Sequence, residues 1–232
     1  MGTLKGEALR VVKWGLRPWR RRTRAHALIL LYHRIARDTS DPWKLCVTPE
    51  NFRGQLRVLQ RHCEFVPLTA IPDCLAAMRP SGRTPVAITF DDLPYASVPA
   101  EDNAQLRAMT ARLLQHLQAD RIPAVGFVNE AKLYRGGVLD AERIDLLRSW
   151  ILAGFELGNH TYSHPSLNRV PLEAFQADVL RGETVTRALT QEAGRPLRWF
   201  RHPFLHLGKT AEVRTAFQDF LAVHGYIAAP VT

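Results

Sequence analysis

The sequence is poor in cysteine and lacks a long apolar run, and both scarcities narrow the class of protein. Its three cysteines, Cys46, Cys63 and Cys74, are odd in number and do not have the spacing of a metal site. We expect ordinary thiols and no need for an oxidising compartment. The apolar run at residues 27–32 is far shorter than a signal-peptide core or a membrane span. A cytoplasmic or peripheral-membrane location is therefore the default expectation.

Repeats and low-complexity segments are also lacking, which excludes solenoid and fibrous architectures. The 232 residues are enough for one domain and at most two. Apolar residues make up 46% of the chain and charged residues 23%, so a sizeable core and an ordinary polar surface are expected.

Acidic residues are scarce at the start of the chain. The first 24 positions hold eight lysines and arginines against a single acid, Glu7, within a net charge of +9. We predict a basic N-terminal segment over residues 1–26 and a single domain over residues 27–232. The segment could contact anionic membrane, acidic glycan or nucleic acid, or be a solvated tail; Trp14 and Trp19 favour the membrane surface. No DNA- or RNA-binding motif is present, so no specific nucleic-acid partner is expected.

Strand-like and helix-like segments alternate along the chain. Predicted strands cover residues 27–32, 86–90, 124–128, 155–158, 197–200 and 226–231. One predicted helix begins at Pro49. The other predicted helices cover residues 71–78, 103–119, 144–152, 172–190 and 213–224. This alternation predicts parallel strands with crossover helices, whose active site lies at the carboxyl ends of the strands.

Two adjacent acids, Asp91 and Asp92, follow the strand at residues 86–90. Adjacent carboxylates repel each other unless a cation neutralises one of them and leaves the other as a base. Taken alone, the pair is equally explained as a loop or a helix cap.

Two histidines, His160 and His164, follow the strand at residues 155–158. On one helical turn, a spacing of four places both imidazoles on the same side. With one carboxylate they would form a metal site of two histidines and one acid that keeps open positions. A coincidental surface pair is the alternative.

A third group, Arg201-His202-Pro203-Phe204, follows the strand at residues 197–200. An arginine at this position can pair with a catalytic carboxylate and orient it. The alternative is a structural salt bridge beside a rigid turn.

In this order, the three groups resemble the polysaccharide deacetylase family of carbohydrate esterases, over residue 28 to the end. Thr89 to Asp92 match its first motif, His160 to His164 its second, and Arg201, Pro203 and Phe204 its third. The resemblance implies an α/β fold, a distorted (β/α) barrel of about seven strands.

The resemblance also implies roles for the matched residues. Asp91 would be the catalytic base, paired with Arg201, while Asp92, His160 and His164 would bind a divalent metal, with zinc favoured. Pro203 and Phe204 would contact substrate, and the Phe204 amide would stabilise the oxyanion. The expected reaction is the removal of acetyl groups from N- or O-acetylated sugars of a polysaccharide or glycolipid.

The sequence departs from the family pattern in several places. Leu93 replaces the usual glycine after the acid pair, and His202 stands where a small residue or proline is usual. The later motifs, including a Leu-x-His whose histidine is the acid, are not found near the C-terminus, so we expect a barrel that is incomplete there. The alternative function is therefore a non-catalytic metal- or carbohydrate-binding relative. His33 lies just past the first strand, where a structural role is favoured over a substrate contact.

Overall fold

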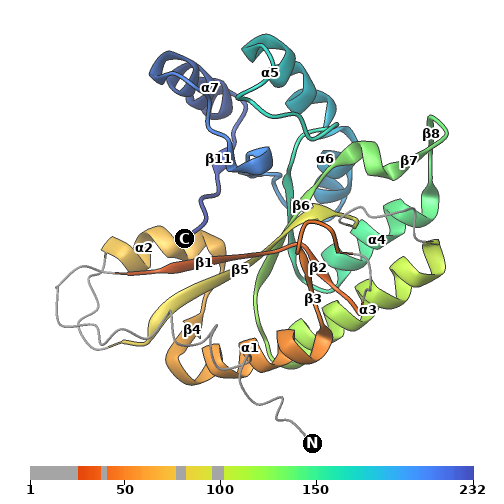
Figure 1. Ribbon diagram of the computed structural model, residues 1–232, viewed down its shortest axis with the longest axis vertical. Coiled ribbons are helices and arrows are strands. Elements are labelled where there is room, and N and C mark those ends of the chain that lie inside the picture. The colour runs from red at the N-terminus through yellow and green to blue at the C-terminus, as the bar shows by residue number, and fades with distance from the viewer. Residues whose placement is uncertain (1–25, 38–40, 77–81, 96–101) are drawn as a thin grey trace, which may run out of the picture.

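The computed structural model describes residues 26–37, 41–76, 82–95 and 102–232 (Figure 1). The basic segment falls outside this range except for its last residue, so its membrane contact remains a prediction. The strands are β1 (Leu28–Tyr32), β2 (Arg34–Ile35), β3 (Cys46–Val47), β4 (Cys63–Phe65), β5 (Thr84–Leu93), β6 (Ala124–Val128), β7 (Tyr134–Arg135), β8 (Val138–Leu139), β9 (Glu156–Asn159), β10 (Trp199–Phe200) and β11 (Ile227–Ala228).

The helices lie mostly between these strands, as the alternation predicted. They are α1 (Pro49–His62), α2 (Ile71–Ala76), α3 (Asn103–Ala119), α4 (Ala141–Leu152), α5 (Leu172–Arg181), α6 (Thr184–Glu192) and α7 (Ala211–Val223), with short 3-10 turns η2 (Leu68–Ala70), η3 (Glu130–Leu133) and η4 (Pro203–Leu205).

Seven parallel strands form one curled sheet in the order β1-β5-β6-β9-β10-β11, with β4 also paired to β5. In the described chain no strand ladder joins β11 to β1. Instead, Thr232 meets β1: its amide donates to the Ile29 carbonyl at 3.2 Å, and the Ile29 amide donates to Thr232 Oγ1 at 2.8 Å. The expected α/β class and incomplete barrel are confirmed.

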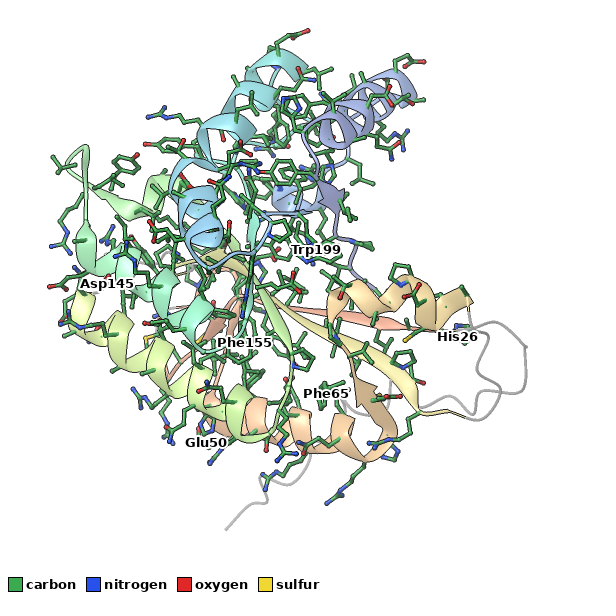
Figure 2. All side chains as sticks on the ribbon, turned by 180° about the vertical axis from the view of Figure 1, so that it is seen from behind. His26, Glu50, Phe65, Asp145, Phe155 and Trp199 are labelled. Carbon is green, nitrogen blue, oxygen red and sulfur yellow. The ribbon has the colours of Figure 1, made fainter. Side chains whose placement is uncertain are left out.

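Side chains along β5 point alternately to the outer, helix-covered face of the sheet and to its inner face. Val86, Ile88 and Phe90 pack into the core between the sheet and helices α1, α3 and α4, whereas Ala87 joins the cluster inside the curl. Because side chains alternate between faces, Asp91 falls on the inner side. Side chains fill both spaces (Figure 2), with Trp199 in the inner cluster.

The prediction of one continuous helix over residues 172–190 is wrong, because the chain forms two helices there, α5 and α6. A Cβ on Gly182 would lie 2.3 Å from the backbone carbonyl carbon of Thr161, so the break accommodates the loop that carries the histidines. Helix α6 then begins where the buried Glu130 carboxylate accepts hydrogen bonds from Val185 N and Thr186 N. These bonds satisfy amides that a helix start leaves unpaired.

Candidate active site

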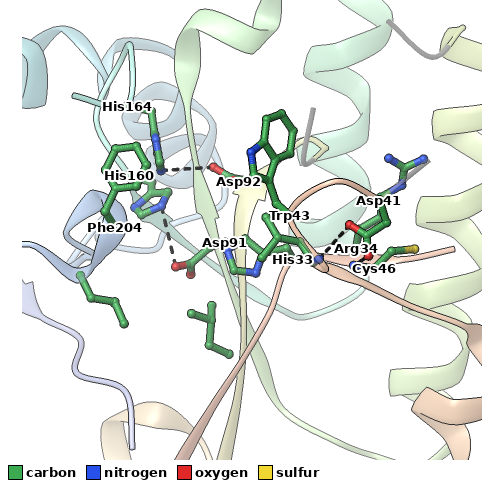
Figure 3. Close-up of a pocket in the computed structure, with 13 residues that line it drawn as sticks. His33, Arg34, Asp41, Trp43, Cys46, Asp91, Asp92, His160, His164 and Phe204 are labelled. Atoms are coloured by element: carbon green, nitrogen blue, oxygen red, sulfur yellow. Dashed lines mark hydrogen bonds and ion pairs between the residues drawn. The ribbon is translucent and has the colours of Figure 1, made fainter. Parts of the chain in front are cut away.

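A cavity of about 550 Å³ opens at the carboxyl ends of the strands and contains the predicted acids and histidines (Figure 3). Asp91 and Asp92 come from β5, while His160 and His164 come from the loop after β9. We call these four residues the acid–histidine cluster. Positions that are distant in the sequence meet here because the strands are parallel, as expected.

A bulge in β5 brings both adjacent carboxylates into the same cavity. Neighbouring strand residues normally face opposite sides of a sheet. The β5–β6 register shifts between Phe90 and Leu93, and Asp92 adopts a left-handed backbone conformation with φ 69°. The bulge therefore turns Asp92 back to the side already occupied by Asp91, as bulges beside active sites commonly do.

The two histidines converge from an irregular loop, so the expected helical turn is wrong. Thr161 and His164 have positive φ angles of 68° and 60°, and the two imidazole centroids lie 4.9 Å apart. The Asp178 carboxylate of α5 accepts hydrogen bonds from the amides of Tyr162 and Ser163, which holds the loop in this shape.

Asp92, His160 and His164 fit a divalent cation. Each offers one ligand atom, and these atoms lie within 4.8 Å of one another. His160 Nδ1 lies 2.7 Å from the Arg201 carbonyl, to which it can donate, so Nε2 is left as the metal-facing atom. His164 Nε2 lies 3.5 Å from Asp92 Oδ1. Two imidazoles and one carboxylate are a set typical of zinc and other transition metals.

Electrostatics hold these ligands in their metal-binding protonation states. Burial lowers the pKa of His160 to about 3 and also lowers the pKa of His164, so both imidazoles are neutral. Burial alone would raise the pKa of Asp92, but the pKa is lowered overall, and the positive charge of Lys132 is the largest effect that lowers it.

Lys132 is a site residue that no sequence motif indicated. Its ammonium lies 3.2 Å from Asp92 Oδ1 and donates to the Asp92 backbone carbonyl at 3.2 Å. Because it comes from a 3-10 turn after β6, nothing in the local sequence pattern distinguishes it from a surface lysine. It offsets the negative charge of the carboxylate and supports its strained backbone.

Asp91 pairs with the completely buried Arg201, as predicted. Arg201 Nη1 lies 3.7 Å from Asp91 Oδ1, while Nη2 donates to Thr89 Oγ1 and the guanidinium lies 4.6 Å from the centroid of the Phe127 ring. Burial raises the pKa of Asp91 to about 7, against the lowering effect of Arg201. A carboxylate with a pKa near neutrality is well suited to general-base catalysis.

Of the residues of the third motif, some are buried in the core and one lines the cavity. Pro203 is buried under the turn, whereas Phe204 is 58% exposed, lines the cavity and lies 4.5 Å ring-to-ring from His164. Phe204 and Leu205 both adopt positive φ, which turns the chain past the site. His202, which stands where a small residue or proline is usual in the family, is buried against Phe200.

His33 lines the same cavity, which favours the role that we ranked second for it. The parallel register pairs Tyr32 with Phe90, so the next step along places His33 beside Asp91. Leu31-Tyr32-His33 matches the Leu-x-His pattern that we expected only near the C-terminus. The pattern was visible in the sequence, but at the other end of the chain.

The sequence profile described as "Polysaccharide deacetylase" matches residues 79–220, well over half of the chain and all three motifs. A parallel α/β fold with an acid–histidine cluster at its strand ends defines a class of hydrolytic sites. The chain belongs to the polysaccharide deacetylase family.

Curated relatives carry related names. A chitooligosaccharide deacetylase from Bradyrhizobium is 30% identical over 162 residues, 69% of this chain and 64% of the relative. A peptidoglycan-N-acetylglucosamine deacetylase from Bacillus cereus is 23% identical over 177 residues, 75% of this chain and 56% of the relative. The matched part thus spans less than two thirds of each relative.

Solved structures share the fold. IcaB from Ammonifex degensii superposes with a TM-score of 0.62 at 21% identity, covering 88% of this chain and 83% of IcaB. The Streptococcus pyogenes deacetylase PplD, solved with acetate, gives 0.61 at 16% identity over 88% of this chain and 82% of PplD. Within the described residues, no helix is both long and apolar enough to cross a membrane.

Proposed function

We propose that the chain is a metal-dependent deacetylase that removes acetyl groups from N-acetylated sugars of a glycan. One observation supports this most directly: three metal-ligand residues lie within 4.8 Å of one another, in a cavity that they share with the base Asp91. The names of the curated relatives, which specify chitooligosaccharide and peptidoglycan N-acetylglucosamine, favour an N-acetylhexosamine over an O-acetyl ester.

The residues of the chain divide the reaction between them. Asp92, His160 and His164 would hold the cation, for which zinc is the favoured ion. When bound, the cation polarises the acetyl carbonyl and lowers the pKa of water. Asp91 takes a proton from the attacking water, and Arg201 orients Asp91 and stabilises its charge. The Phe204 amide is the proposed backbone donor to the oxyanion.

His33 is the proposed acid for the leaving group. Water adds to the carbonyl carbon, the C–N bond breaks, and the departing nitrogen must gain a proton to leave as an amine. His33 lines the cavity from the end of β1 and, in its protonated form, would supply that proton. Burial lowers the pKa of His33, while the charge of Asp92 favours the protonated form. The non-catalytic alternative was based on a missing acid, and the proposed role of His33 would remove that reason for preferring it.

Metal content and acetate release test the proposal together. We expect about one divalent ion per chain, acetate release from N-acetylglucosamine oligomers, and loss of both in His160→Ala and Asp92→Asn. His62→Ala, at an exposed position at the end of α1, is the matched histidine control and should keep both. Metal without acetate release would favour the binding-only alternative, and a folded chain that binds no metal would exclude the proposed site.

A further inference from the structure

The cavity has an aromatic side chain that the proposed chemistry does not use. Trp43 is 63% exposed, lines the same cavity as the acid–histidine cluster, and lies on the opposite side of Asp92 from Phe204 (Figure 3). An exposed tryptophan leaves a large apolar surface in water, which is unfavourable unless a ligand covers it.

The turn that presents Trp43 is firmly held. The Asp41 carboxylate accepts hydrogen bonds from the amides of Leu45 at 2.8 Å and Cys46 at 2.9 Å, and the Lys44 amide donates to the Asp41 carbonyl. Lys44 adopts a left-handed conformation with φ 55°, which closes the turn tightly after Trp43. The strand that follows the turn, β3, pairs with β2, and Arg34 and Cys46 of these two strands line the cavity.

The cavity therefore has a polar floor and a partly apolar rim. The floor carries the carboxylates and imidazoles, and the rim carries Trp43 on one side and Phe204 on the other. Leu205, which follows Phe204 in the chain, is also exposed and lines the cavity. A pyranose ring has this same division, because its hydroxyl and acetamido groups are polar while its axial C–H faces are weakly apolar. The electron-rich face of an indole attracts such C–H groups.

We propose that Trp43 provides a second sugar subsite, by stacking on the residue next to the deacetylated one, and so determines how strongly an oligomer is preferred to the monomer. The inference depends on the proposed function for the identity of the reaction. The cavity volume of about 550 Å³ lies within the usual range for ligand sites, and it extends from the carboxylates to Trp43. A sugar held at both places would be fixed in register over the acid–histidine cluster.

The test compares substrates of different length. Acetate release is measured with the N-acetylglucosamine monomer, its β-linked tetramer and an alkyl glycoside of the monomer. We expect Trp43→Ala to lower the tetramer-to-monomer ratio of kcat/KM by about tenfold, mainly through KM. Trp43→Phe should retain most of the ratio, and Leu152→Ala, a control that removes an 85%-exposed apolar side chain on α4, should leave it unchanged.

Other outcomes overturn the inference. An equal loss on all substrates would make Trp43 structural, and an unchanged ratio would remove the subsite. A preference for the alkyl glycoside over the tetramer, lost in Trp43→Ala, would assign the rim to a lipid chain instead.

A binding measurement separates this inference from the proposed function. Calorimetric titration with the tetramer does not require turnover. Tetramer binding that weakens about tenfold in Trp43→Ala but not in Trp43→Phe would support the subsite even if no acetate were released. Equal affinity in all variants would overturn it even if the enzyme proved active.

Discussion

The floor and the rim of the cavity are built on opposite principles. On the floor, Asp91, His160 and Arg201 are nearly or completely buried, and burial shifts the pKa of each one. On the rim, Trp43 and Phe204 are more than half exposed. Under the proposed function, the difference separates reactivity, which requires dry and fixed groups, from substrate selection, which requires accessible surface. Substitutions on the floor should therefore affect stability and chemistry, and those on the rim mainly substrate preference.

Among substitutions on the floor, Arg201→Met is expected to have the largest effect on stability. The substitution leaves the charge of Asp91 buried without its partner, and we expect the free energy of unfolding to fall by about 3–5 kcal/mol at pH 8. Because the pKa of Asp91 in the folded chain is raised to about 7, the carboxyl is mostly protonated at pH 5 and the loss should be smaller there.

Urea unfolding at both pH values measures this effect. The double variant Asp91→Asn/Arg201→Met removes the unpaired charge and should recover part of the stability. Equal losses at both pH values, without recovery in the double variant, would mean that Arg201 stabilises the chain only through its packing on Phe127.

His33→Ala tests whether His33 belongs to the floor, where the chemistry is proposed to take place, or to the rim. If His33 is the acid, kcat on an N-acetyl sugar should fall by about 10²–10³-fold, within the usual range for general-acid catalysis. Hydrolysis of p-nitrophenyl acetate should fall much less, because its leaving group departs without a proton. Bound metal should stay at the wild-type level. A uniform loss on both substrates would place His33 among the structural or substrate-binding residues.

Gly182→Ala tests how the loop of the metal site is supported from behind. A Cβ at this position would lie 2.3 Å and 2.4 Å from backbone atoms of Thr161 and Tyr162, so the loop must shift. We expect a loss of about 2–3 kcal/mol in unfolding free energy, together with weaker metal binding. Gly54→Ala is the matched control, because a Cβ in this α1 glycine meets nothing within 4 Å and alanine favours a helix. Unchanged metal affinity in Gly182→Ala would show that the loop geometry is tolerant.

The sequence predicts which residues meet at the site better than it predicts the backbone conformation of those residues. The parallel strands, the incomplete barrel and the meeting of Asp92 with His160 and His164 follow from periodicity and from the order of the motifs. The left-handed residues at Asp92, Thr161, His164, Phe204 and Leu205 do not, because tertiary packing imposes them against local preference.

Lys132 and His33 illustrate two different limits of prediction from the sequence. Lys132 lies beside Asp92 only because η3 folds back over the strand end, a contact that no local pattern encodes. His33 did have a recognisable pattern, Leu31-Tyr32-His33, but the expected chain order directed attention to the C-terminus. Spatial adjacency of β1 and β5, and not sequence order, places that residue at the site.

The smallest of these effects concerns His202, a buried histidine beside Arg201 that does not line the cavity and has no predicted role in the reaction. Its ring is 7% exposed and packs against Phe200 and Phe217, and burial, aided by the charge of Arg201, lowers its pKa to about 4. The unfolded chain binds a proton at this residue below about pH 6.5, whereas the folded chain does not until about pH 4. The contribution of His202 to the free energy of unfolding is therefore fully present at neutral pH and declines as pH falls through this window, by about 2 kcal/mol between pH 7.5 and 5.

His202→Phe keeps an aromatic ring in the cluster and removes the titration, so its unfolding free energy should depend less on pH by that amount. Urea unfolding of both proteins across the window measures the difference. Parallel curves would mean that His202 is protonated in the folded chain and that the aromatic cluster around it is less dry than its packing implies.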